Sequence, residues 1–248
     1  MSKFTLPTET IELPSKGLLY PKDSELSKGT IEMKYMTARE EDILTNQSYI
    51  SKGTVIDKLM KALIISKINY DQLLLGDKNA IMVAARVLGY GSNYDFKYNK
   101  ENYTIDLSKV ENKKLDEKLF KSNVNEFDFT LPHSGNKITF KLLTHKDEND
   151  ISRELEGLKK INKESSSELT TRLKYLIQSI NGEKEKKEIR DFVDNYLLAR
   201  DSRALREYIK EIQPDVDLTF FPEENESSVS VPIGVNFFWP DAWYNRPI

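Results

Sequence analysis

The sequence contains no cysteine, and this absence removes several chemistries together. A chain without thiols forms no disulfide bond, offers no thiolate to zinc or to an iron–sulfur cluster, and has no cysteine nucleophile. The fold must therefore be held together by packing alone.

Long apolar runs are missing as well. Residues 1–4 lead directly into alternating polar and apolar positions, without the apolar stretch that a signal peptide needs. Other apolar stretches are a few residues long, far short of the roughly 20 that span a bilayer. We expect no integral membrane segment, and a location in the cytoplasm or in a virion.

The chain also lacks an excess of one charge. Its 248 residues include 37 basic and 40 acidic side chains, interspersed along the sequence, and the formal net charge is -3. Such a surface creates no long-range field that attracts phosphate, so nucleic acid is disfavoured as the main partner. The hydrophobic share of 38% is enough for one large core or two small ones.

Motifs of catalysis and cofactor binding are absent. There is no nucleophile elbow, no lysine-containing phosphate loop and no calcium loop. Gly89-Tyr90-Gly91 begins like a dinucleotide fingerprint but follows a predicted helix and lacks the third glycine. It is better explained as a helix stop. We expect no catalytic, cofactor-binding or metal-binding residues.

Histidines and clustered charges have simpler explanations than chemistry. His133 lies in a predicted turn and His145 at a predicted helix start, without zinc-protease spacing, so both are expected to be solvated. The acidic groups at 40–42 and 147–150 fall in first helical turns, where they offset the helix dipole. The mixed run 183–188 is typical of a solvated helix face.

Secondary-structure signals occur twice in the same order. The first series comprises a strand over 10–13 with a turn at 14–17, a strand over 30–36, a helix capped at Thr37, a helix over 55–64, a helix from Asp77 to Leu88, and a hairpin over 94–98 and 103–107. The second series comprises 129–135 as strand and turn, a strand over 138–143, a helix capped at Thr144, a helical stripe of Leu169, Leu173, Leu176 and Ile180, another of Ile189, Phe192, Val193 and Tyr196, a helix from Asp201 ended by Pro214, and a hairpin over 216–220 and 228–231.

This order predicts an α+β protein with two related lobes, produced by internal duplication. Each lobe should contain strands, about three helices and a β-hairpin. The predicted boundaries are residues 1–111 for the N-terminal repeat lobe, 112–125 for a lysine-rich linker, and 126–248 for the C-terminal repeat lobe with its aromatic tail.

The aromatic tail contains both tryptophans of the chain. Its candidate protein-interaction residues are Phe237, Phe238, Trp239 and Trp243. One alternative is that the tail folds back to finish its own C-terminal lobe; the other is that it anchors a partner, because interfaces are enriched in large aromatics. The partner alternative is favoured, since the duplicated fold should be complete near Val231.

Several segments together resemble the baseplate hub and hub-assembly proteins of T-even-type contractile phages. The segments that carry the resemblance are Leu13-Pro14-Ser15-Lys16-Gly17-Leu18-Leu19-Tyr20-Pro21, Arg39-Glu40-Glu41-Asp42-Ile43-Leu44, Leu88-Gly89-Tyr90-Gly91 with Tyr94, Asp201-Ser202-Arg203-Ala204-Leu205-Arg206, and Phe237-Phe238-Trp239-Pro240. Relatives with this pattern carry paired cysteines in the two hairpins; 97–102 and 221–225 contain none here, which leaves these hairpins to be held by packing.

The resemblance implies a late protein of virion assembly, needed to build the central hub of the tail baseplate. Its implied partners are hub, spike or tape-measure proteins in the host cytoplasm, and it carries no catalytic residues. Two alternatives stay open: a stable structural subunit of the virion baseplate with no separate assembly role, or an enzyme with an unrecognised acidic site.

Overall fold

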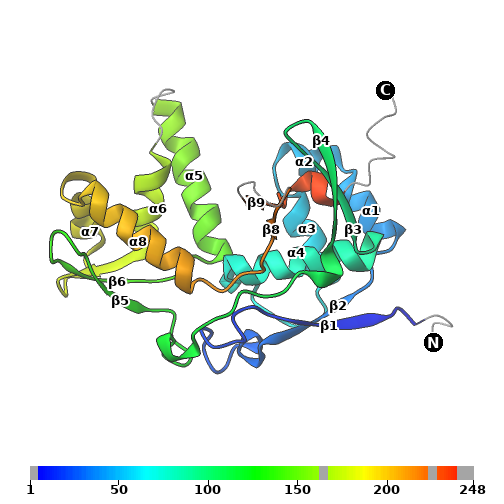
Figure 1. The fold of residues 1–248 in the computed structure, drawn as a ribbon, viewed down its shortest axis with the longest axis horizontal. Coiled ribbons are helices and arrows are strands. Elements are labelled where there is room, and N and C mark those ends of the chain that lie inside the picture. The colour runs from blue at the N-terminus through cyan, green and yellow to red at the C-terminus, as the bar shows by residue number, and fades with distance from the viewer. Residues whose placement is uncertain (1–4, 162–166, 223–227, 239–248) are drawn as a thin grey trace.

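The computed structural model describes residues 5–161, 167–222 and 228–238 (Figure 1). These residues form helices and small antiparallel sheets, so the predicted α+β class is confirmed. Within the described ranges, no helix is both long and apolar enough to cross a membrane.

The first half begins with a β-hairpin and continues through helices to a second hairpin. Its elements are β1 (Thr8–Glu12), η1 (Glu25–Lys28), β2 (Thr30–Lys34), α1 (Ala38–Leu44), α2 (Gln47–Ser51), α3 (Val55–Leu63), η2 (Tyr70–Gln72), α4 (Leu75–Tyr90), β3 (Asn93–Tyr98), β4 (Glu101–Asp106) and η3 (Leu107–Lys109). β1 pairs with β2, and β3 pairs with β4, both antiparallel.

The second half also begins with two paired strands and continues through helices to a hairpin, but a third strand, β7, interrupts its helices. Its elements are η4 (Glu117–Leu119), β5 (Phe127–Thr130), β6 (Lys137–Phe140), α5 (His145–Ile161), α6 (Glu168–Leu176), β7 (Ile177–Ile180), α7 (Lys186–Asn195), α8 (Ala199–Ile212), β8 (Thr219–Phe220), β9 (Val229–Ser230) and η5 (Val235–Phe238). In Figure 1, α5 and α6 extend side by side away from the rest of this half.

One predicted helix is wrong at its end. The stripe through Ile180 was expected to be helical, but α6 ends at Leu176 and the next four residues form β7. β7 pairs antiparallel with β6 and gives the second half a three-stranded sheet. A short apolar run fits a buried strand as well as a helix, and pairing with β6 decides between them.

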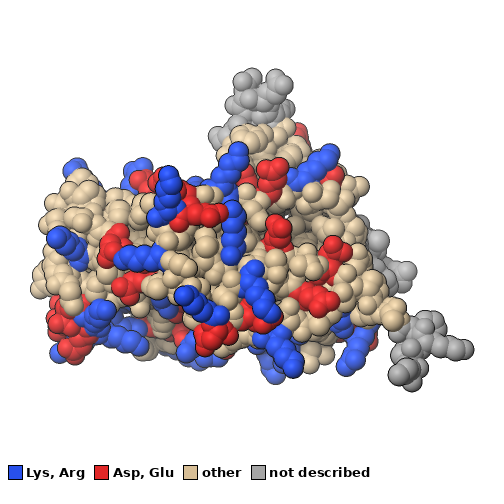
Figure 2. All heavy atoms as spheres, turned by 90° about the horizontal axis from the view of Figure 1, so that it is seen from below, with Lys and Arg blue, Asp and Glu red and all other residues tan. Residues whose placement is uncertain are grey.

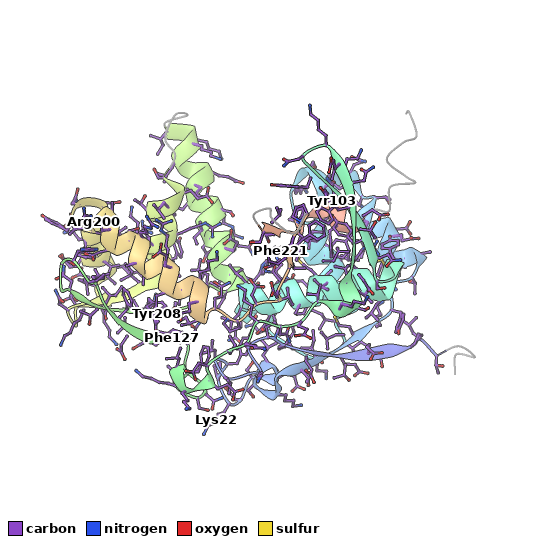
Figure 3. All side chains as sticks on the ribbon, viewed as in Figure 1. Lys22, Tyr103, Phe127, Arg200, Tyr208 and Phe221 are labelled. Carbon is purple, nitrogen blue, oxygen red and sulfur yellow. The ribbon has the colours of Figure 1, made fainter. Side chains whose placement is uncertain are left out.

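Aromatic side chains fill the space between this sheet and α8. Phe129 stacks on Tyr208 with ring centroids 5.0 Å apart, and Phe140 meets the same tyrosine edge-on at 6.0 Å. Phe127 stacks on Phe140 at 5.3 Å. Figure 3 labels Phe127 and Tyr208 between β5 and α8, where these rings form the second half's core.

Helix α4 lies in the middle of the molecule and is packed on several sides (Figure 1). Its first turn touches the backbone that follows α8: a Cβ at Gly76 would lie 1.7 Å from the carbonyl oxygen of Pro214. Glycine is therefore required at this position, because any side chain would collide with backbone. The contact fixes the end of the second half against the centre of the first.

The predicted linker, residues 112–125, is bonded to both halves. Asn123 donates from its backbone to Leu18 at 2.6 Å and from its side chain to the Tyr20 carbonyl at 2.9 Å. Asn125 exchanges two hydrogen bonds with the backbone of Leu142, at 2.8 and 2.9 Å. Buried apolar residues of both halves form one continuous core. The segment therefore joins the halves as a packed connection.

Candidate functional site

The predicted interaction residues divide between the core and the undescribed end of the chain. Phe237 and Phe238 lie in η5 and are 1% and 0% exposed. Phe237 meets Tyr94 of β3 edge-on, with ring centroids 4.7 Å apart, and Phe238 at 5.4 Å. Trp239 and Trp243 lie outside the described residues. In this conformation neither phenylalanine is accessible to a partner.

These two rings complete the first half of the chain. We call residues 213–222 and 228–238 the C-terminal strap, because they leave α8 and return across the first half (Figure 1). Phe220 of the strap packs edge-on against Phe96 at 5.2 Å and Tyr103 at 5.1 Å. The expectation that the fold is complete near Val231 is therefore wrong: the β8–β9 hairpin and the aromatic pair beyond it pack on the β3–β4 hairpin.

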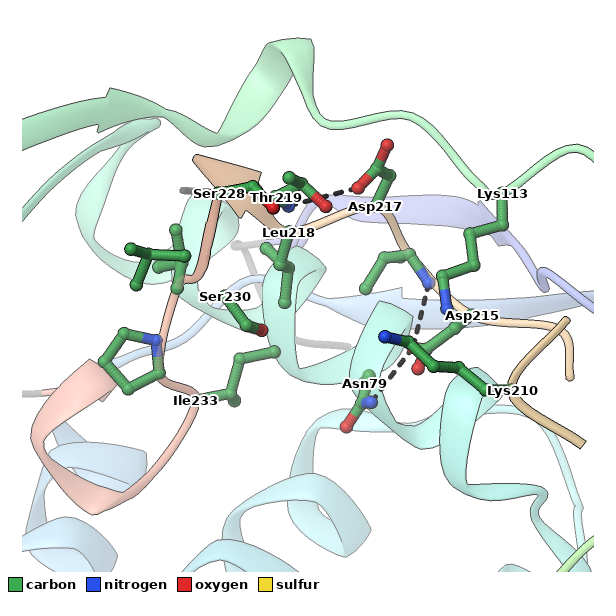
Figure 4. A pocket seen from close by; sticks show the side chains of 14 residues that line it. Asn79, Lys113, Lys210, Asp215, Asp217, Leu218, Thr219, Ser228, Ser230 and Ile233 are labelled. Carbon is green, nitrogen blue, oxygen red and sulfur yellow. Dashed lines mark hydrogen bonds between the residues drawn. The ribbon is translucent and has the colours of Figure 1, made fainter. Parts of the chain in front are cut away.

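A cavity of about 510 Å³ lies beneath the strap (Figure 4). The side chain of Asn79, on α4, donates to Asp215 Oδ1 at 3.0 Å, and the backbone of Val216 donates to the same oxygen at 2.9 Å. Asp217 accepts from the backbone of Thr219 at 3.1 Å, and this hydrogen bonding lowers the pKa of Asp217. Both carboxylates thus hold turns of the strap.

Two lysines border the same cavity without forming ion pairs with these carboxylates. Lys113 and Lys210 point toward Asp215 in Figure 4, yet neither forms an ion pair with any residue in the described part of the chain. Two lysines and two aspartates leave the lining without net charge. The cavity has polar walls but no pair of groups arranged as nucleophile and base.

In each half, a buried carboxylate at the start of a helix anchors the turn that follows the first strand. Asp77, in the first turn of α4, accepts from the backbone of Ser15 at 2.9 Å and from its hydroxyl at 2.6 Å, as well as from the hydroxyl of Tyr20. Burial raises the pKa of Asp77 despite these donors. Tyr20 in turn accepts from the backbone of Leu74 at 2.9 Å. The Ser15 turn is thereby fixed to α4.

Asp201, in the first turn of α8, has the corresponding role. Its two oxygens accept from the backbones of His133 at 2.8 Å and Ser134 at 3.0 Å. Burial by itself would raise the pKa of Asp201, but these donors outweigh it and the pKa is lowered. Asp77 and Asp201 are both fully buried. They act as structural anchors, and neither lines the cavity beneath the strap.

Two of the predicted first-turn carboxylates, Glu40 and Asp147, are buried. Glu40 accepts from the backbone of Thr37 at 3.0 Å and pairs with Lys34 at 2.8 Å. Asp147 repeats this arrangement, accepting from the backbone of Thr144 at 2.9 Å and pairing at 2.7 Å with Lys141, which directly follows β6. Both helices start directly after a strand-ending segment, as the duplication requires. The duplication itself stays a prediction.

His145 is buried, which corrects the expectation that it is solvated. The side chain is 2% exposed and lies edge-on to Tyr70, with ring centroids 4.6 Å apart. Lys78 Nζ lies 3.1 Å from His145 Nδ1, and His145 Nε2 lies 3.0 Å from Asn149 Nδ2 and 3.4 Å from Asp57 Oδ2. Burial and the charge of Lys78 lower the pKa of His145.

We call Asp57, Tyr70, Lys78 and His145 the junction cluster, because these residues join the two halves. Lys78 also pairs with Asp57 at 2.8 Å, and Tyr70 donates to the same carboxylate at 3.1 Å. The sequence could not indicate it, because its three first-half residues are distant from His145 along the chain. Among the residues that the structure describes, no group of three or more potential metal-binding side chains is present.

The sequence also missed a second cavity, of about 600 Å³, bounded by η2, the start of α5, the end of α6 and the start of α7. Six cationic and three acidic side chains line it. Two of the lysines, Lys184 and Lys186, belong to the run that was interpreted as a solvated helix face. That run holds three lysines and three glutamates, so its composition gave no signal of a basic site.

Elsewhere the charges are mixed. Figure 2 shows Lys and Arg interspersed with Asp and Glu over the face seen from below, without a broad area of one sign. Comparison with known proteins gives no assignment: no family model matches the chain, and neither the curated proteins nor the solved structures contain a significant match.

Proposed function

We propose that this chain is a hub assembly protein of a contractile phage baseplate, and that it acts by binding other proteins. The segments that resemble this family provide contacts on which the fold depends. The turn at Ser15 is bonded to α4, the first turn of α8 contains Asp201, and Phe237 and Phe238 close the first core. A shared fold would explain why these segments, rather than surface residues, carry the resemblance.

Exposed apolar side chains at the end of the α5–α6 arm are the observation that carries a binding role. Ile161, the last residue of α5, is 86% exposed, and Leu169, in the first turn of α6, is 45% exposed. The two helices are neighbours, so these side chains lie at the same end of the arm. Exposed apolar surface at a projecting end is typical of a contact site for another protein.

The partners that fit this proposal are the hub, spike or tape-measure proteins, met in the host cytoplasm during tail assembly. A stable virion subunit would use the same surfaces, so the two roles differ in the fate of the protein. An enzymatic role is less well supported, because the fully buried carboxylates Asp77 and Asp201 are engaged in anchoring turns.

The test is a double substitution, Ile161→Asp with Leu169→Asp, in an affinity-tagged chain expressed in infected cells. We expect the variant to melt like the wild type, because exposed positions change stability by about 0.5 kcal/mol or less. It should no longer co-purify hub, spike or tape-measure proteins, and tail assembly should fail.

Leu119→Asp is the matched control, since Leu119 is 44% exposed and lies in η4, away from the arm. The control should assemble normally. Normal assembly and partner recovery with the arm variant would contradict the proposal. Quantifying the protein in finished particles separates an assembly factor, which is absent from them, from a stable baseplate subunit.

A further inference from the structure

The second cavity has an unusual charge arrangement. We call it the basic cavity; its cationic lining residues are Lys141, Lys146, Lys174, Lys184, Lys186 and Arg190. Its volume of about 600 Å³ is within the range of sites that hold small ligands or a few side chains. It lies where η2 of the first half meets three stretches of the second, 141–150, 174–178 and 184–190.

Half of these cations are neutralised by the protein itself. Lys141 pairs with Asp147 at 2.7 Å, Lys174 with Asp194 at 2.7 Å, and Arg190 with Glu154 at 2.8 Å. These pairs are part of the wall, since their lysines are largely covered. They explain the presence of three cations without a ligand.

The other half have no such explanation. Lys146, Lys184 and Lys186 form no ion pair with any residue in the described ranges. Glu183, one of the two acids adjacent to Lys184, accepts from the backbone amides of Lys184 and Glu185, both at 2.8 Å. Three exposed lysines without an ion pair therefore line one cavity.

Two of these lysines lie at helix N-termini, where a positive charge is unfavourable. Lys146 is in the first turn of α5 and Lys186 begins α7, which has no side-chain cap. The N-terminal end of a helix carries partial positive charge, so a cation there is unfavourable by typically 0.3–1 kcal/mol. Positions that cost stability without a compensating contact are expected where a ligand supplies the missing negative charge.

We propose that the basic cavity binds an acidic peptide segment of another protein through its glutamate or aspartate side chains. Three acidic residues, Asp71, Asp147 and Asp150, also line the cavity. The separate carboxylates of a peptide can meet the lysines one at a time, whereas a continuous phosphate backbone would be repelled by these aspartates. The proposal stands on the cavity alone and does not depend on a role in phage assembly.

The probe is a fluorescein-labelled hexaglutamate peptide, and binding is followed by fluorescence anisotropy with the full chain. We expect saturable binding that weakens with added salt, because exposed charges are screened. Lys146→Gln, Lys184→Gln and Lys186→Gln, combined, should weaken binding about tenfold or more, since three ion pairs of up to about 1 kcal/mol each are lost.

The matched control neutralises three other exposed lysines without ion pairs, Lys22→Gln, Lys52→Gln and Lys97→Gln. It changes the net charge equally and should leave affinity unchanged. Thermal melts of both triple variants establish that each is folded.

Three results would overturn the proposal. The first is no binding of hexaglutamate by the wild type, and the second is an equal loss in both triple variants, which would mean general attraction to the surface. In the third, a labelled oligothymidylate of equal charge binds at least as tightly and is lost in the same cavity variant, which would make nucleic acid the ligand.

Discussion

The two halves fix the same turn with the same kind of buried carboxylate, yet they enclose it differently. In the first half, Asp77 receives two hydroxyl groups and one amide and lies at the centre of the molecule, near Asp215. In the second, Asp201 receives two backbone amides from a turn whose side chains are exposed. Burial prevails for Asp77 and raises its pKa, whereas hydrogen bonding prevails for Asp201 and lowers it.

The halves differ in the same way in how they are completed. The C-terminal strap leaves the second half and packs on the first. Its β8–β9 hairpin contacts the β3–β4 hairpin there, with Phe220 against Phe96 and Tyr103. The second half ends at α8, and α5 and α6 extend from it (Figure 1). One half is therefore more enclosed and the other more open.

The strap gives the largest expected effect. Phe238→Ala removes a fully buried ring from the first half's core and should lower the free energy of unfolding by about 3–5 kcal/mol, measured by urea denaturation. Phe221→Ala is the control, because this strap residue, labelled in Figure 3, is 64% exposed. Its change should stay within about 0.5 kcal/mol. Equal stability of the two variants would show that the strap does not complete the first half.

The anchoring carboxylates give the next effect. In Asp201→Asn, the new amide group must face the backbone N–H of His133 or Ser134, and the unpaired donors should cost about 1–3 kcal/mol. In Asp77→Asn, one oxygen still accepts from the backbone of Ser15, and the hydroxyl groups of Ser15 and Tyr20 can rotate to accept. The second variant should therefore lose less stability at neutral pH.

Acidification sharpens this difference. A carboxylate with a lowered folded-state pKa stabilises the protein above its unfolded-state value, about 3.9, and that contribution is lost as pH falls through the folded-state pKa. The deficit of Asp201→Asn should thus shrink in acid. A raised pKa, as for Asp77, makes the free energy of unfolding depend on pH in the opposite direction. The folded protein takes up the proton at a higher pH than the unfolded chain, so acidification stabilises the wild type and the deficit of Asp77→Asn should grow. Parallel pH profiles for the two variants would contradict the assigned directions.

The helix starts should respond equally, because they are built alike. Thr37→Ala and Thr144→Ala each remove a hydroxyl that donates to the third helical residue, Glu40 at 2.6 Å or Asp147 at 2.8 Å. Each should cost about 0.5–2 kcal/mol in thermal or urea unfolding. The exposed Thr45→Ala is the control. A large effect in one half only would argue against the duplication.

The sequence predicted what depends on neighbours along the chain. Alternation around Tyr94 and Phe96 predicted the β3–β4 hairpin. Threonine followed by an acid three residues later predicted the starts of α1 and α5. The start of α4 was predicted at Asp77, two residues after Leu75, because the first turn of α4 lacks a side-chain cap that would mark its start.

What the sequence missed depends on distant contacts. β7 exists because β6 offers a free edge, and an apolar run alone does not reveal a pairing partner. The strap packs on the first half because rings more than a hundred residues earlier in the chain receive Phe220 and Phe237. For the same reason the burial of His145, which depends on Tyr70 and Lys78, was not visible in the sequence.

His145 gives the smallest expected effect, a shallow pH dependence from one titrating group at the junction of the halves. Lys78 and the more distant Lys61 disfavour its protonation, Asp57 and Asp71 favour it, and burial keeps the net pKa below the ordinary value. The unfolded chain therefore binds the proton more readily, so stability should fall as pH falls below about 6.5, the unfolded-state pKa of histidine. Melting curves of wild type and His145→Gln between neutral and mildly acidic pH test this. The variant should have a flatter profile in that window, while His133→Gln, at an exposed position, keeps the wild-type slope. A wild-type slope in His145→Gln would mean that the junction cluster does not couple folding to this proton.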